Sequence, residues 1–116
     1  MSRLPLEGIR VADFTWALSG PYGMEWLSVM GAEVIRIESA LRPDVLRTNP
    51  FTTTGVEAGL NQAAGYNCLN YSKKSCTLNL QTEKGVELAK RIISVSDIVS
   101  DSFAYGVMER DRKSVV

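Results

Sequence analysis

The sequence predicts an α/β fold, a Rossmann-like incomplete half-domain built on a mainly parallel sheet. Segments with the pattern of strands alternate with segments that have the period of helices, in the order strand, helix, strand, long loop, strand, helix, strand. The first three segments together have the length of a βαβ unit, about 30 residues, in which the two strands are parallel. With 116 residues, 45% of them apolar, the chain suits one globular domain at most.

Two apolar, β-branched segments predict the strands of this unit, residues 9–14 and 33–38. Asp13 lies at the end of the first strand, where we expect it to cap the following turn. Glu38 ends the second strand, at the place where a dinucleotide-binding domain holds an acidic residue for the ribose. The turn at residues 19–23 lacks the G-x-G-x-x-G spacing, which argues against that interpretation.

A helix is predicted between these strands. Proline suits the first helical position, so Pro21 marks its start, and Gly31 marks its end. Tyr22, Trp26 and Met30 recur at i, i+4 and i+8, with Leu27 beside them, which predicts that they form the buried stripe of this helix.

Residues 39–65 are polar and irregular and predict a long loop, with one helical turn near residues 43–47. Arg42 and Arg47 in this loop are candidates for contact with a phosphate, although surface arginines are more often solvated. Residues 76–80 alternate as a half-buried strand does, directly after the lysine pair Lys73 and Lys74.

The last two elements are a helix and a short strand. Thr82 is the predicted N-cap of the helix, and residues 97–99 begin the strand. One apolar face of the helix consists of Val86, Ala89, Ile92 and Ile93.

Composition excludes several classes of protein. Thirteen basic and thirteen acidic residues cancel, so nothing predicts a nucleic-acid or membrane partner, and the cytoplasm is the expected location. The chain has no histidine, which excludes Ser-His-Asp and Cys-His catalysis within it. Cys68 and Cys76 alone do not make a zinc site, so no metal is expected.

Several ordered blocks carry a resemblance to a known family. They read PLEGIRVADFT at residues 5–15, GP at residues 20–21 and GAEVIRIE at residues 31–38. These blocks resemble the N-terminal portion of the class III (CaiB/BaiF-type) CoA-transferases, a family that also includes α-methylacyl-CoA racemases. The resemblance extends to about Arg110, so residues 1–110 are interpreted as the N-terminal CoA-binding portion and residues 111–116 as a divergent tail.

The resemblance implies contacts with coenzyme A. Loops at the carboxyl ends of strands are where open α/β sheets place ligands, and the lysine pair would clamp the coenzyme's 3′-phosphate or diphosphate. The implied CoA-binding residues are Ala17, Leu18, Ser19, Lys73, Lys74, Ser102, Phe103 and Arg110. Ser102 replaces the family's usual asparagine and Tyr105 its usual proline. From spacing alone, Trp16 and Leu18 would equally serve only to cover the sheet edge.

The resemblance also implies an activity, the transfer of coenzyme A from an acyl-CoA to a carboxylic acid by a homodimer. An aspartate of the family takes the acyl group covalently, and we expect it beyond Val116, so that no catalytic residue is assigned here and this chain alone is a fragment without activity. A racemase or isomerase of the same family, and a non-enzymatic fragment of an interrupted gene, remain alternatives.

Overall fold

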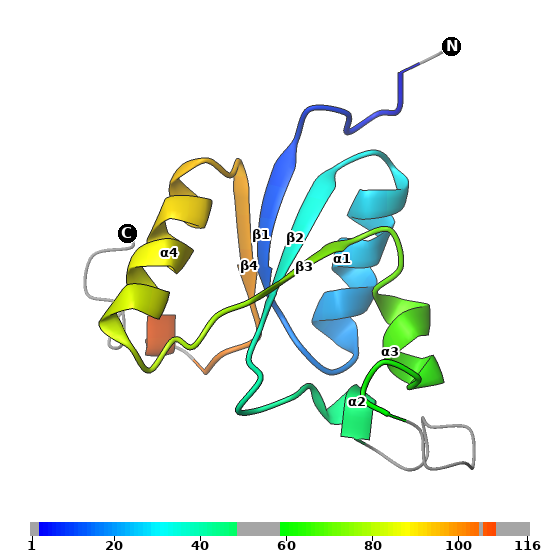
Figure 1. Ribbon diagram of the computed structural model, residues 1–116. Helices are drawn as coiled ribbons and strands as arrows, with labels where there is room; N and C mark the ends of the chain where they lie inside the picture. The colour runs from blue at the N-terminus through cyan, green and yellow to red at the C-terminus, as the bar shows by residue number, and fades with distance from the viewer. Residues whose placement is uncertain (1–2, 49–58, 105, 109–116) are drawn as a thin grey trace.

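The computed structural model of the chain describes residues 3–48, 59–104 and 106–108. Its centre is a parallel sheet in the order β3-β2-β1-β4 (Figure 1). The strands are β1 (Arg10–Phe14), β2 (Glu33–Glu38), β3 (Lys74–Thr77) and β4 (Ile98–Asp101). The predicted α/β class with a parallel sheet is confirmed.

Helices cover both faces of this sheet. The helices are α1 (Ser19–Val29), α2 (Val45–Thr48), α3 (Ala64–Leu69) and α4 (Glu83–Ser94). In Figure 1, α1 and α3 lie on one side of the sheet and α4 lies on the other. Side chains alternate along a strand, so Val11 packs toward α1 with Val34, whereas Ala12 and Phe14 pack toward α4.

The start of α4 follows the predicted capping chemistry. The Thr82 side chain accepts a hydrogen bond of 3.0 Å from the backbone N–H of Gly85. A Cβ at Gly85 would lie 1.9 Å from the backbone oxygen of Asn79. The helix therefore approaches residues 78–81 at a distance that only glycine allows.

The prediction for the buried face of α1 is wrong for Tyr22, Trp26 and Met30, which are exposed. It is confirmed for Leu27, which packs on the core cluster of Val11, Ala32 and Val34. Tyr22 and Trp26 are 50% and 52% exposed, and they meet edge to face with 6.1 Å between ring centroids. The buried face instead carries Pro21, Glu25 and Ser28. Met24 and Leu27 pack on the core from this side of the helix, whereas Tyr22 and Trp26 lie on its exposed side.

Two local features differ from the sequence prediction. Helix α3 was not predicted, because its N-cap residue is Ala63, which has no side-chain acceptor and so gives no capping signal in the sequence. Strand β3 begins at Lys74 and ends at Thr77, because the chain then turns so that Leu78 and Leu80 pack on the core cluster with Phe14. In the part of the chain that is described, no helix is long and apolar enough to span a membrane.

Candidate functional site

A cavity of about 380 Å³ lies at the carboxyl ends of the strands. Residues at or after the end of each of the four strands line it, so we call it the strand-end cavity. Open parallel sheets place their ligands at this edge. Its apolar wall consists of Phe14, Ile37, Leu41, Leu78, Leu80 and Phe103. Trp16, Asn79 and Gln81 also line it.

Asp44 organises the polar wall of this cavity. Its Oδ2 accepts a hydrogen bond of 3.0 Å from the backbone N–H of Ala17, and its Oδ1 accepts one of 2.9 Å from Leu46. Arg36 Nη2 donates to the same Oδ2, and both side chains are 2% exposed. Asp44 thereby ties the loop after β1 to the loop after β2.

A second, half-buried ion pair joins Glu38 and Arg47. Arg47 Nε and Nη2 donate to the two Glu38 oxygens at 2.9 and 3.0 Å, and the guanidinium carbon lies 3.5 Å from the centre of the Tyr66 ring. Tyr66 and Ser75 also donate to Glu38. Burial opposes ionisation, yet these hydrogen bonds hold the pKa of Glu38 below its ordinary value. Burial and the bond to Glu38 raise the pKa of Tyr66 to about 12.

These contacts occupy both carboxylate oxygens of Glu38. Glu38 is thereby committed to Arg47, Tyr66 and Ser75 within the chain, so the geometry gives the dinucleotide interpretation no support.

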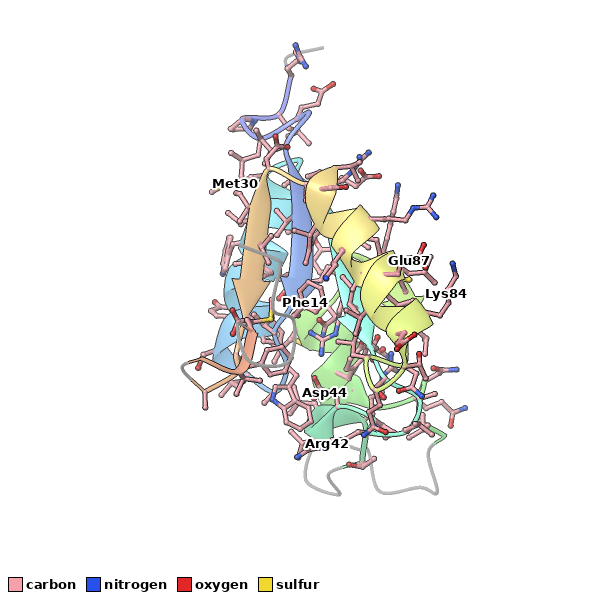
Figure 2. All side chains as sticks on the ribbon, turned by 90° about the vertical axis from the view of Figure 1, so that its left-hand side faces the viewer. Phe14, Met30, Arg42, Asp44, Lys84 and Glu87 are labelled. Carbon is pink, nitrogen blue, oxygen red and sulfur yellow. The ribbon has the colours of Figure 1, made fainter. Side chains whose placement is uncertain are left out.

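The mouth of the cavity combines an aromatic ring with a cation. The Arg42 guanidinium carbon lies 4.9 Å from the centre of the Trp16 ring, within the range of a cation–π contact. Figure 2 shows Arg42 and Asp44 at the same end of the molecule, with Met30 toward the opposite end. A flat, electron-rich ligand group at this end would meet both an aromatic face and a positive charge.

The loop after β1 contains a residue with an unusual backbone conformation. Ala17 adopts a φ of 63°, a left-handed conformation that is uncommon for a residue other than glycine. Leu18 and Ser19, which were predicted to contact coenzyme A, are exposed beside it. Ser102 Oγ accepts a hydrogen bond of 3.2 Å from the Trp16 backbone N–H, so this residue holds the loop in place.

The structure separates the two lysines that were predicted to act as a clamp. Lys73 is 2% exposed and donates to Pro21 O at 2.8 Å, to Asn70 Oδ1 at 2.9 Å and to Asp13 Oδ2 at 3.4 Å. Burial lowers the pKa of Lys73, and the Asp13 charge opposes that shift. Lys74 instead pairs with Glu33 at the surface. Neither lysine lines the strand-end cavity.

Asp13 has the capping role that was predicted for it. Its Oδ1 accepts hydrogen bonds from the Thr15 hydroxyl and, at 2.9 Å, from the Thr15 backbone N–H. Its side chain is fully buried, and Lys73 supplies the compensating charge.

Of the predicted contact residues, the structure places Phe103 in the cavity wall, Ala17, Leu18 and Ser102 in the adjoining loops, and Ser19 at the start of α1. Arg110 lies outside the described residues.

Sequence reasoning missed Arg36 as a residue of the site. The signal that could have identified it is a charged side chain within an otherwise apolar buried strand. Among the described residues, no group of three or more His, Cys, Asp or Glu side chains could hold a metal ion.

Comparison with known sequences finds one family across nearly the whole chain. The model of CoA-transferase family III matches residues 6–112. The alpha subunit of succinyl-CoA–L-malate CoA-transferase from Chloroflexus aurantiacus is 36% identical over 107 residues, which cover 92% of this chain and 24% of that protein. Succinyl-CoA:glutarate CoA-transferase from Homo sapiens is 34% identical, with 88% and 22% covered.

Solved structures agree with the sequence match. A CaiB/BaiF family protein from Brucella suis superposes with a TM-score of 0.82 at 30% identity, over 98% of this chain and 31% of that one. The chain thus spans about a quarter to a third of the length of these relatives. Because sequence and fold agree over this span, the chain belongs to CoA-transferase family III.

Proposed function

We propose that this chain binds coenzyme A in the strand-end cavity and forms the CoA-binding part of an enzyme that transfers coenzyme A from an acyl-CoA to a carboxylic acid. The observation that carries the proposal is the position of the cavity, at the carboxyl ends of all four parallel strands. Its apolar wall and its Trp16–Arg42 mouth suit a ligand with a flat base and charged groups.

The relatives support the reaction class. Proteins named as CoA-transferases for succinyl-CoA with malate or glutarate, and for formyl-CoA with oxalate, match nine-tenths of this chain. Each name pairs a CoA thioester with a carboxylic acid. The proposal for this cavity concerns coenzyme A and names no particular carboxylic acid.

We assign the proposed contacts to the loops that border the cavity. Phe103 lies in the wall, Ala17 and Leu18 lie in the loop after β1, and Ser19 is the first residue of α1. Arg110, which lies outside the described residues, stays a proposed contact on the family resemblance alone. Ser102 supports that loop through the Trp16 N–H. Lys73 takes an internal role: its ammonium joins the end of β1 to the first turn of α1.

We further propose that this chain alone does not transfer coenzyme A, and that the full protein acts as a homodimer with its nucleophilic aspartate elsewhere. The carboxylates that line the cavity are committed to other groups. Glu38 is bound by Arg47, and Asp44 is bound by Arg36 and two backbone N–H groups. An ion-paired carboxylate held in this way is a poor nucleophile, because attack would break its hydrogen bonds.

Calorimetric titration with coenzyme A tests the proposal. Replacing Arg42 by alanine should weaken binding by about 1 kcal/mol, because it removes a cation at the mouth of the cavity. Arg91→Ala is the matched control, since Arg91 is exposed on α4 and lines no part of the cavity. Equal affinities in the wild type and the Arg42 variant would remove this mouth from the binding site.

A further inference from the structure

Arg36 is a buried cation with unused hydrogen-bond donors. Its side chain is 2% exposed, and it lines the strand-end cavity. Its Nη2 atom donates to Asp44. Within residues 3–48, 59–104 and 106–108, its Nε and Nη1 atoms are buried and have no hydrogen-bond partner. Unpartnered donors of a buried charged group are costly, and each one in a native protein calls for an explanation.

Neighbouring carboxylates do not provide that explanation. Asp44 is already bound to Nη2, and the other described carboxylate paired with Arg36 is Glu38, whose Oε1 lies 3.9 Å from Nε, beyond hydrogen-bond distance. Glu38 is already bound by Arg47, Tyr66 and Ser75, so moving it toward Arg36 would break existing bonds.

The charges around the cavity favour an anion. Two arginines, Arg36 and Arg42, and two carboxylates, Glu38 and Asp44, line the cavity. Asp44 pairs with Arg36, and Glu38 pairs with Arg47 outside the lining, so Arg42 is the lining charge that neither pair offsets. A guanidinium suits the oxygen atoms of phosphates and carboxylates, because its N–H groups lie in one plane at fixed angles.

We propose that Arg36 binds an oxyanion of the ligand in the strand-end cavity, through Nε and Nη1. The inference rests on the proposed function and deepens it, because it names a binding residue and the chemical class of its ligand group. That oxyanion is a phosphate group of the coenzyme or the carboxylate of an acid substrate. Asp44 is the positioning residue, since it holds the third nitrogen and thereby fixes the orientation of the guanidinium.

Nitrogen-15 NMR of the full chain tests this assignment without any substitution. The Arg36 Nε–H resonance, assigned through bonds, is followed while coenzyme A, dephospho-coenzyme A or succinate is added to saturation. We expect it to shift downfield with at least one probe. Arg47 Nε–H is the internal control and should stay in place, because it already donates to Glu38 at 2.9 Å.

The three probes distinguish the sources of the oxyanion. A shift with coenzyme A but not with its dephospho form assigns the 3′-phosphate. Equal shifts with both forms assign the diphosphate, and a shift with succinate assigns a substrate carboxylate. An Arg36→Lys variant keeps the charge and the Asp44 pair but loses the planar donors, and we expect it to bind the assigned probe at least tenfold more weakly.

Failure of the inference is distinct from failure of the proposed function. If coenzyme A shifts the backbone amides around the cavity and Arg36 Nε–H does not move with any probe, the role of Arg36 is overturned and the function stands. If coenzyme A shifts no amide at all, both are overturned.

Discussion

Replacing Gly85 by alanine should push the first turn of α4 away from Asn79, a residue that lines the strand-end cavity. The added Cβ would lie 1.9 Å from the Asn79 oxygen and 2.6 Å from the Asn79 carbonyl carbon. Both are backbone atoms, so no rotamer change relieves the contact. Alanine gains about 0.5–1 kcal/mol over glycine in a helix. Overpacking costs about 1–3 kcal/mol, and a backbone clash belongs at the upper end of that range.

The net loss of unfolding free energy for Gly85→Ala should be about 2 kcal/mol. Gly23→Ala in α1 is the matched control, because no atom of the described residues lies within 4 Å of its added Cβ, and it should gain about 0.5–1 kcal/mol. Urea unfolding followed by circular dichroism measures both values. If the two variants unfold at the same urea concentration, the close approach of α4 to residues 78–81 is refuted.

Three further predictions follow from the buried charges and the exposed helix. Lys73→Met should lower the unfolding free energy by about 3–5 kcal/mol, because it leaves Asp13 buried without its counter-charge. Lys74→Met is the control: the Lys74 side chain is 69% exposed, so this change should lower the unfolding free energy by less than about 1 kcal/mol in the same urea experiment. Equal losses in the two variants would contradict the separation of the two lysines. The raised pKa of Tyr66 adds stability that is fully present below pH 10 and is lost as the pH rises from 10 toward 12, an effect of about 2–3 kcal/mol. Urea titrations across this range should show a smaller decline for Tyr66→Phe than for the wild type, and parallel declines would contradict the shift. The exposed Tyr22 and Trp26 side chains should make the isolated chain self-associate in sedimentation velocity runs, and Trp26→Glu should reduce that association, because Trp26 is 52% exposed. A monomeric wild type, or an unchanged distribution of species in the variant, would contradict this role of the α1 surface.

Much of the fold could be predicted, because local patterns and tertiary packing agree there. The limits of β2 are those of the apolar segment at residues 33–38, and Thr82 caps α4 as its sequence context indicates. The rotation of α1 could not be predicted. Its apolar stripe has the correct period, but period alone does not say whether a stripe faces this sheet or a surface that other residues would cover.

Part of the candidate site could also be predicted from the sequence, and part could not. Phe103 and the loop at residues 17–19 were predicted at the strand ends, because the edge of a parallel sheet that binds ligands follows from strand order. Lys73 and Lys74 were grouped because they are neighbours in sequence. In a strand or its approach, successive side chains point in opposite directions, so one lysine is buried and the other exposed.

The central claim, that the strand-end cavity binds coenzyme A, is tested most directly by mapping backbone amide shifts of the nitrogen-15-labelled chain during titration with coenzyme A. We predict saturable shifts concentrated on the cavity residues Trp16, Asn79, Gln81 and Phe103, with residues of α1 such as Trp26 unaffected. Saturable shifts confined to surfaces away from the cavity, or no shifts at millimolar coenzyme A, would contradict the claim.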